Sequence, residues 1–368
     1  MRVIVLSSFG LGGAERQALL LARQWVLDGQ RVCVCAPGPD GPVTSACRDL
    51  GIRSLVLPPI WGGRRSQAFR LFRVAAALRG IGPTVLLPYI HIPNVVCGAI
   101  WRATGANGCI WNQRDEGLSP DRGLLQRHAV RNTSRFVANS SMGRRYLLDR
   151  LGAPPERVVL VRNGVDLAPP KASRAVWRSW LGVGRFDVAV TMVANLTSTK
   201  DHLTLLRAWS IVQTCMAAHS VRAWLLLAGR EGDTAFDVRL WAQRLGLQHC
   251  VRFLGAVHDV AGLLQASDVA VLSSHSEGCP NCVLESMACG LPVAGTDIVG
   301  IRETIDPSGY PFLAPASDAE ALAGCLVALI SDPERRHMLG QIGLERARSI
   351  YSVQRMCSEI DCLIADIL

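Results

Sequence analysis

The sequence predicts an α/β protein with two doubly wound domains, each built on a parallel sheet covered by helices. Short apolar runs alternate with segments of helical periodicity along most of the chain, which is typical of parallel strands joined by crossover helices. Glycine-rich turns follow several of the apolar runs, as they do in nucleotide-binding folds of this class. The chain has 368 residues, and at about 150 residues per domain that is enough for two separate cores.

The first half of the chain carries the pattern of one such domain. Its opening strand runs into Gly10, Gly12 and Gly13, which permit a tight turn before a helix that begins near Ala14. Further strands are predicted at 31–36, 54–58, 84–90 and 108–111, with helices at 66–80 and 95–105 and a strand, helix and strand within 135–166.

The second half repeats the alternation after a proline-containing linker. Strands are predicted at 188–194, 223–229, 251–255 and 269–274, with helices at 202–212 and 236–246 and a terminal amphipathic helix over 352–368. We therefore expect domain boundaries near 168 and 350.

The chain is organised around residues 277–300, which read as a loop and a helix after the strand at 269–274. Glu277 lies in the predicted loop, Pro280 fits the first helical turn, and Glu285 lies inside the helix that Gly290 and Pro292 end. Free amide hydrogens at a helix start bind phosphate, and here acids flank them on both sides. This arrangement suits a sugar nucleotide, with the diphosphate on the amides and hydroxyls on the carboxylates.

This stretch resembles the signature of retaining glycosyltransferases of family 4. The resemblance covers Glu277-Gly278, Pro280-Asn281 and Glu285 with Met287, Ala288, Gly290 and Pro292, and an Asn-Gly-Val-Asp turn at 163–166 agrees with it. It implies a GT-B fold, in which two Rossmann-like domains face a central cleft. Residues 1–168 would then form the acceptor-side domain, 169–350 the nucleotide-sugar donor domain, and 351–368 a helix packing back on the first domain.

The resemblance also implies roles for residues on the donor side. Glu285 would hold the ribose, Glu277 the donor-sugar hydroxyls, and Lys200 would offset the charge of the leaving diphosphate with help from Arg230. Asn195 stands where the family usually has an arginine. The remaining predicted donor contacts are Gly12 and Gly13 in the first-domain loop and Cys279, Pro280, Asn281 and Cys282 around the helix start.

Two polar clusters are predicted to lie in acceptor-side loops because each follows a strand of the first half. His91 and Asn94 follow the strand at 84–90, and Arg114 follows the strand at 108–111. His91 would orient an acceptor hydroxyl or touch the donor sugar; the alternative is a histidine bonded within its own loop. Many family members carry a histidine after the later strand, where this chain has Arg114 and Asp115.

Charge is unevenly distributed between the halves. Residues 1–180 carry 25 Lys and Arg against 10 Asp and Glu, whereas residues 181–368 carry 14 against 20. Five arginines lie on or beside the segment 66–80, whose Phe69, Phe72, Ala76 and Leu78 form an apolar stripe: Arg64, Arg65, Arg70, Arg73 and Arg79. Either this helix meets an anionic membrane surface or its stripe faces the core. No nucleic-acid-reading motif accompanies the charge, so we expect no nucleic-acid partner.

The composition indicates the cellular compartment of the protein and its need for a metal or cofactor. No run of eighteen apolar residues occurs, and the apolar run at the N-terminus is too short for a signal peptide, so we expect a cytoplasmic protein. Thirteen cysteines, an odd number scattered through apolar runs, indicate reduced thiols, and the single Cys279-x-x-Cys282 has no partner for a zinc site. Because no Asp-x-Asp occurs, we expect metal-independent catalysis without a cofactor.

The predicted reaction moves a sugar from a UDP- or GDP-sugar to a hydroxyl of a glycan or lipid-linked acceptor, with retention at the anomeric carbon, in polysaccharide or glycolipid synthesis. Two other classes remain open. One is an epimerase or glycan phosphorylase on the same fold, because a fold does not fix a reaction. The other is a non-catalytic protein that binds sugar nucleotides or polyanions.

Overall fold

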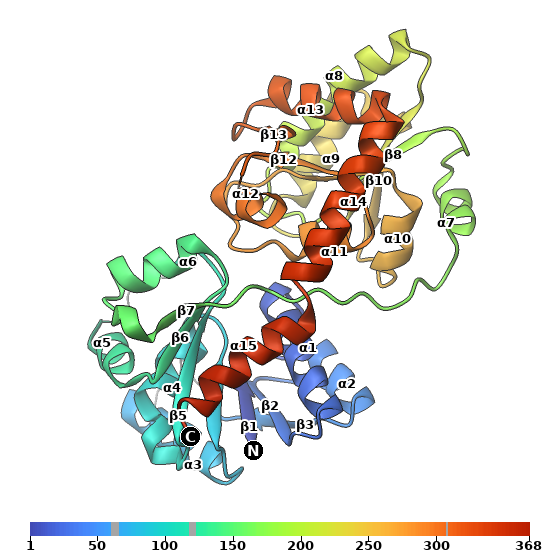
Figure 1. The fold of residues 1–368 in the computed structure, drawn as a ribbon. Coiled ribbons are helices and arrows are strands. Elements are labelled where there is room, and N and C mark those ends of the chain that lie inside the picture. The colour runs from blue at the N-terminus through green and yellow to red at the C-terminus, as the bar shows by residue number, and fades with distance from the viewer. Residues whose placement is uncertain (60–65, 118–122, 307) are drawn as a thin grey trace. The chain divides into compact units, whose positions relative to one another are not determined.

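The computed structural model describes residues 1–59, 66–117, 123–306 and 308–368, which form two compact units (Figure 1). Unit 1 comprises Met1–Gly164 and Ser352–Leu368, and unit 2 comprises Val165–Tyr351. The sequence-based boundaries lie at 168 and 350.

Unit 1 is built on a seven-stranded sheet with the order β3-β2-β1-β4-β5-β6-β7, and its strand pairs are parallel. Its strands are β1 (Arg2–Val5), β2 (Val32–Pro37), β3 (Arg53–Leu57), β4 (Val85–Pro88), β5 (Gly108–Gln113), β6 (Arg135–Ala138) and β7 (Val158–Leu160). Its α-helices are α1 (Gly13–Leu27), α2 (Pro42–Asp49), α3 (Gln67–Arg79), α4 (His91–Thr104), α5 (Gly123–Asn132), α6 (Ser141–Arg145) and α15 (Val353–Ala365). Strand order reverses at β1, which pairs with β2 on one side and β4 on the other, and ligands bind at such switch points.

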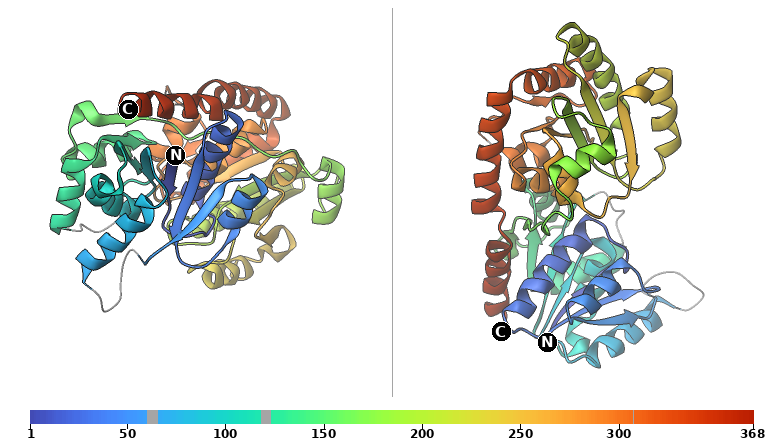
Figure 2. Two further views of the ribbon diagram at one scale, coloured as in Figure 1. Left: turned by 90° about the horizontal axis from the view of Figure 1, so that it is seen from below. Right: turned by 90° about the vertical axis from the view of Figure 1, so that its right-hand side faces the viewer.

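Alternate residues of β1 enter two separate cores because side chains along a strand point to opposite faces. Ile4 packs with Trp25 of α1 and Ile360 of α15, whereas Val3 and Val5 pack with residues of α3 and α4 on the other face. The C-terminal helix α15 lies beside α1 (Figure 2). It therefore completes the core of unit 1 although it comes last in the chain.

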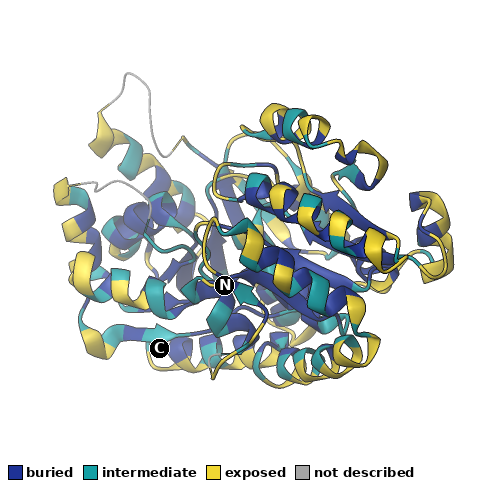
Figure 3. Ribbon diagram, turned by 90° about the horizontal axis from the view of Figure 1, so that it is seen from above, coloured by how far each residue is buried: buried dark blue, intermediate teal, exposed yellow. Residues whose placement is uncertain are grey.

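Unit 2 is built on a six-stranded parallel sheet with the order β10-β9-β8-β11-β12-β13. Its strands are β8 (Val188–Val193), β9 (Ala223–Ala228), β10 (Val251–Gly255), β11 (Val269–Leu272), β12 (Val293–Thr296) and β13 (Leu313–Ala314). Its α-helices are α7 (Arg174–Leu181), α8 (His202–Ala218), α9 (Ala235–Arg244), α10 (Val260–Ala266), α11 (Asn281–Ala288), α12 (Val299–Ile305), α13 (Ala319–Ser331) and α14 (Pro333–Ile350). Strands β8, β9, β11 and β12 are buried, the edge strand β10 is mostly half-buried, and the outer faces of the helices are exposed (Figure 3), so the core lies between sheet and helices.

Helix α3 buries only one residue of the predicted apolar stripe, Leu78. Val74, Ala75 and Leu78 are buried, whereas Phe69 and Ala76 are exposed and Phe72 keeps 70% of its surface in solvent. The helix carries two apolar stripes, and the stripe with 3–4 residue spacing through Val74 and Leu78 takes the core side. The predicted arginines Arg64 and Arg65 lie outside the described residues. Within the described residues, no helix combines the length and apolarity that a bilayer crossing requires.

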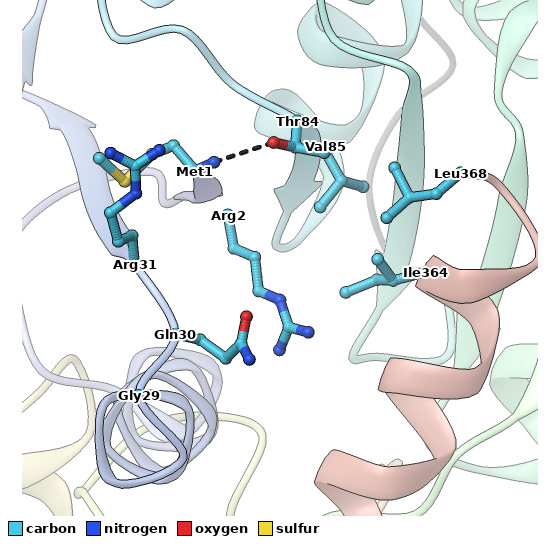
Figure 4. Close-up of a pocket in the computed structure, with 9 residues that line it drawn as sticks. All are labelled: Met1, Arg2, Gly29, Gln30, Arg31, Thr84, Val85, Ile364 and Leu368. Atoms are coloured by element: carbon cyan, nitrogen blue, oxygen red, sulfur yellow. Dashed lines mark hydrogen bonds between the residues drawn. The ribbon is translucent and has the colours of Figure 1, made fainter.

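A cavity of about 290 Å³ lies at the amino-terminal edge of the sheet of unit 1 (Figure 4). It is lined by Arg2, Arg31, Thr84 and Val85 together with Ile364 of α15, among others. The Met1 amine donates a hydrogen bond to Thr84 Oγ1 at 2.9 Å across its rim. Because β1 and β4 begin here, the cavity lies at the opposite edge of the sheet from the predicted acceptor-side residues.

Candidate active site

The candidate site in unit 2 is centred on an ion pair between two loops at the carboxyl edge of the sheet. Lys200 follows β8 and Glu277 follows β11, and these two strands are neighbours. Lys200 Nζ donates a hydrogen bond to Glu277 Oε1, and the two side chains are only 19% and 12% exposed. The structure thus brings together the two residues predicted to meet the diphosphate and the sugar.

Main-chain hydrogen bonds join the same two loops in a short antiparallel bridge at Lys200 and Ser274. The Asp201 amide donates to the Ser273 carbonyl at 3.0 Å, and the His275 amide donates to the Thr199 carbonyl at 3.0 Å. The position of Lys200 relative to Glu277 is therefore set by the backbone as well as by the ion pair.

Helix α11 begins at Asn281, one residue later than the sequence pattern suggests. Pro280 is the N-cap rather than a first-turn residue, and its extended conformation leads the chain into the helix. Gly300 packs directly behind this loop, since a Cβ there would lie 1.9 Å from the Glu277 carbonyl oxygen and 2.5 Å from that of Gly278. Only glycine at this position lets α12 support the Glu277 loop so closely.

Glu285 and Cys282 lie on α11 near the ion pair. Glu285 is buried, and its position in the helix agrees with the sequence prediction. Burial raises the pKa of the Cys282 thiol to about 12; Lys200 opposes this rise, whereas Glu277 and Glu285 add to it. Cys282 is therefore a neutral thiol within electrostatic reach of all three charged groups.

The loop that carries Lys200 is also tied to the turn after β9. Asn195 Oδ1 accepts the Arg230 amide at 3.0 Å, and the Ser198 amide donates to Asp233 Oδ1 at 3.1 Å. Gly229 permits this approach, because a Cβ there would lie 1.9 Å from the Ala194 carbonyl oxygen. Asn195 thus shapes the loop, and donor contacts from Asn195 and Arg230 stay predictions.

Cys279 faces the core rather than open space. It packs with Leu284 and Tyr351, and Thr304 Oγ1 approaches its sulfur at 3.8 Å. A contact between a donor and residue 279 would therefore come from its main chain. Pro280 is buried as well, whereas Asn281 and Cys282 are partly exposed at the helix start.

In unit 1, the first glycine-rich loop is held by Glu15. Its Oε2 accepts the Gly12 amide at 3.1 Å, and a Cβ on Gly12 would lie 2.7 Å from the same oxygen. Gly12 is the N-cap of α1 in an extended conformation, and Gly13 is the first helical residue. Neither Gly12 nor Gly13 has the positive φ of a glycine-requiring tight turn, and the close contact at Gly12 is with the end of the Glu15 side chain.

His91 and Asn94 are buried in the first turn of α4, so the expectation that they lie in a loop is wrong, whereas their acceptor-side role stays a prediction. The Asn94 side chain forms two hydrogen bonds with the main chain of Asn112, at 2.8 and 3.0 Å. The apolar pattern predicts that this helix begins at residue 95, but α4 begins at His91. The Asn94 side chain is bonded to β5 and does not face solvent, which lets the helix include it. His91 thus packs at the helix start beside the carboxyl ends of β4 and β5.

Arg114 is held by hydrogen bonds to asparagines, and the sequence analysis did not predict this network. Its guanidinium donates to Asn112 Oδ1 at 3.1 Å and to Asn163 Oδ1 at 3.0 Å, and it stacks over the Tyr89 ring at 4.7 Å. Asn139 Nδ2 donates to Asn163 Oδ1 at 3.4 Å. The sequence signal that could have revealed this network is that asparagines lie near the ends of β5, β6 and β7, because these strand ends share one edge of the sheet.

No group of three or more metal-ligating side chains occurs among residues 1–59, 66–117, 123–306 and 308–368. The Lys200–Glu277 pair belongs to unit 2, and the Arg114 network and His91 belong to unit 1. Each cluster lies at the carboxyl edge of its own sheet.

Comparison with known proteins agrees with the two-sheet fold. A model of glycosyl transferases group 1 matches residues 187–332, and a model of glycosyltransferase family 4 matches residues 11–169. The computed structure superposes on HepE of Anabaena, crystallised with UDP-glucose, with a TM-score of 0.84 over 100% of both chains at 20% sequence identity. This likeness shows the two-domain GT-B fold.

Two curated relatives illustrate the sequence similarity. The chain is 29% identical to D-inositol 3-phosphate glycosyltransferase of Kineococcus radiotolerans over 63% of this chain and 58% of that protein. It is 27% identical to N-acetyl-alpha-D-glucosaminyl L-malate synthase of Bacillus anthracis over 51% of this chain and 48% of that protein. The matched region thus spans about half the length of each relative. On these matches, the chain belongs to the group 1 glycosyltransferases of family 4.

Proposed function

We propose that this protein is a retaining glycosyltransferase that moves a sugar from a nucleoside-diphosphate sugar to a hydroxyl acceptor. The observation that carries the proposal is the Lys200–Glu277 pair beside the start of α11, with Glu285 in the same helix. A cation, a helix start and two carboxylates supply the groups that a diphosphate and sugar hydroxyls require.

Catalysis in this site is mainly electrostatic. As the glycosidic bond breaks, negative charge builds on the diphosphate and positive charge on the sugar ring. Lys200 meets the first charge, and Glu277 holds donor-sugar hydroxyls while orienting the lysine. Since the ammonium is already fixed and partly dehydrated, little reorganisation is needed when the leaving group departs. Glu285 binds the ribose, and no side chain acts as a nucleophile in this proposal.

The donor is proposed to be a UDP- or GDP-sugar. HepE, which shares the fold, was crystallised with UDP-glucose, and this supports a uridine donor as the first candidate. The acceptor is proposed to be a glycan or lipid-linked hydroxyl in polysaccharide or glycolipid synthesis. The relatives named above act on inositol 3-phosphate and L-malate by name, so both compounds belong in an acceptor panel.

A panel of UDP, GDP, ADP and their sugars tests donor use. Ligand at ~100 times its dissociation constant stabilises the native protein by about 2.7 kcal/mol, which a thermal melt resolves. Incubating the stabilising donor alone and with acceptors then separates the reaction classes. Sugar-acceptor product with retained anomeric configuration supports the proposal. Epimerised donor, or binding without transfer or hydrolysis across the panel, would overturn it.

We further propose that unit 1 meets an anionic membrane surface through α3, on the cytoplasmic face of the membrane. Phe69 and Phe72 are exposed on this helix together with Arg73 and Arg79. Each arginine near such a surface contributes about 1 kcal/mol, and salt screens the attraction. Binding to phosphatidylglycerol vesicles should fall from low to physiological salt and weaken in Phe72→Ser. Equal pelleting with neutral and anionic vesicles would contradict this proposal.

A further inference from the structure

Two buried serines link the loop that carries Lys200 to the loop that carries Glu277. Ser273 and Ser274 follow β11 directly and are 1% and 0% exposed. Ser273 Oγ donates a hydrogen bond to the Asp201 carbonyl, and Ser274 Oγ donates to the Thr199 carbonyl at 2.9 Å. The two hydroxyls therefore contact the main chain on both sides of Lys200.

The serines are themselves fixed by the neighbouring strand. The Ser274 amide donates to Thr296 Oγ1 at 3.0 Å, and the buried Thr296 is the last residue of β12. Together with the main-chain bridge between 199–201 and 273–275, these bonds connect the chain after β8, β11 and β12. Such a network fixes a loop more firmly than an ion pair at the end of two flexible side chains.

Removing either hydroxyl would take one of two donors from its carbonyl, because the Thr199 carbonyl keeps the His275 amide and the Asp201 carbonyl keeps the Leu205 amide. A side-chain bond between the two loops would be lost, so the loop around Lys200 would be held less tightly. Lys200 sits between the two contacted carbonyls and reaches the candidate diphosphate position through a long, flexible side chain. A misplacement of about 1 Å at a catalytic group can lower a rate about 100-fold.

We propose that Ser273 and Ser274 are positioning residues that hold the Lys200 ammonium against Glu277. Their role in turnover rests on the proposed function, whereas their effect on Lys200 itself does not. The test therefore uses one readout that needs substrate and one that does not.

Ser267→Ala is the matched control for Ser274→Ala. Ser267 lies before β11 rather than after it, is equally buried, and donates from Oγ to the Leu263 carbonyl at 2.8 Å. Both substitutions delete one buried hydroxyl in unit 2, so both should lower the melting temperature. Only Ser274→Ala should change the environment of Lys200.

The first readout is the rate at which an N-hydroxysuccinimide ester acylates Lys200, followed by peptide mass spectrometry without any ligand. Lys171, the other lysine of the chain, is exposed and serves as the internal reference. Ser274→Ala should raise the Lys200 rate relative to Lys171 several-fold, and Ser267→Ala should not. Equal ratios in wild type, Ser274→Ala and Ser267→Ala would overturn the positioning role, whatever the reaction proves to be.

The second readout is a double-mutant cycle on transfer. Ser274→Ala should lower kcat about tenfold in wild type and change it less than about twofold in the Lys200→Ala background, because its effect acts through the lysine. Equal losses in both backgrounds would show a general structural effect and overturn the proposal. If wild type transfers nothing to any acceptor, the proposed function fails, and the acylation ratio alone decides the positioning role.

Discussion

The carboxyl edges of the two sheets carry different kinds of polar groups. In unit 2, Lys200 and Glu277 form a partly buried ion pair, with their side chains 19% and 12% exposed. In unit 1, Arg114 is held by the neutral amide oxygens of Asn112 and Asn163. The two edges have the same parallel topology, so the difference comes from the side chains and not from the fold.

The difference matches two chemical tasks. A leaving diphosphate gains charge during bond cleavage, so its site needs a formal cation already in place. A hydroxyl acceptor stays neutral until late in the reaction, so hydrogen-bonding side chains such as those around Arg114 can bind it without a second ion pair. We therefore propose that donor activation takes place in unit 2 and acceptor recognition in unit 1.

Loss of the unit 2 cation should give the largest effect. Lys200→Ala should lower kcat by ~10²–10³, or about 3–4 kcal/mol, as expected for removal of one preorganised charge at a developing anion. Lys200→Arg should restore little, because a broad guanidinium does not replace a compact ammonium between phosphate oxygens. Steady-state transfer kinetics of both variants measure this. A kcat within about threefold of wild type would mean that Lys200 is an ordinary exposed-loop residue.

The buried carboxylate of α11 should affect binding rather than chemistry. Glu285→Ala should raise the donor KM by about 10- to 100-fold with little change in kcat, because a charged hydrogen bond to ribose contributes about 1.5–3 kcal/mol in ground and transition states alike. Glu285→Gln is the matched variant, since it keeps the shape. An unchanged donor KM in folded Glu285→Ala would remove this residue from the site.

Much of the fold follows from residue patterns that are local. Alternation of apolar runs and helical periodicity predicts two parallel sheets, and Glu277 and Glu285 are placed in loop and helix because glycine and proline bracket them. Helix α11 still begins one residue later than predicted, since proline serves as a cap as well as a first-turn residue.

The errors concern features that depend on contacts far apart in sequence. His91 and Asn94 were expected in a loop, but helix α4 begins at His91, and hydrogen bonds between Asn94 and Asn112 stabilise its first turn against β5. In α3, the predicted apolar stripe contains both Phe72 and Leu78, and only the packed structure shows that Leu78 is buried and Phe72 is exposed. The Arg114 network joins three strand ends, and no local spacing reveals it.

Acid should destabilise unit 2 through His202, the first residue of α8 behind the Lys200 loop. Burial lowers the pKa of His202 from 6.5 to about 4, so the folded state favours the neutral ring. Stability is therefore fully present above pH 6.5 and is lost as the pH falls towards 4, on the order of 2–3 kcal/mol in all. Thermal melts between pH 7.5 and 4.5 test this, with His202→Gln expected to flatten the profile. A wild-type slope unchanged in His202→Gln would contradict the assignment.

Chelation should have the smallest effect. Because Lys200 and the helix start provide the proposed charge for the diphosphate, transfer in EDTA should stay within about twofold of the untreated rate. The same assay with added Mg²⁺ or Mn²⁺ provides the control. Loss of most activity in EDTA, restored by either ion, would show that the ion pair of unit 2 is not the main source of positive charge.

Calorimetric titration of UDP and GDP tests the division between the two edges most directly. Wild type and Arg114→Ala should bind the preferred nucleotide with similar affinity, whereas Lys200→Ala should bind it about tenfold or more weakly, since one charge-assisted contact to phosphate is lost. Arg230→Ala is measured beside them, because Arg230 is the alternative cation. Unchanged binding in Lys200→Ala together with lost binding in Arg230→Ala or Arg114→Ala would contradict the account.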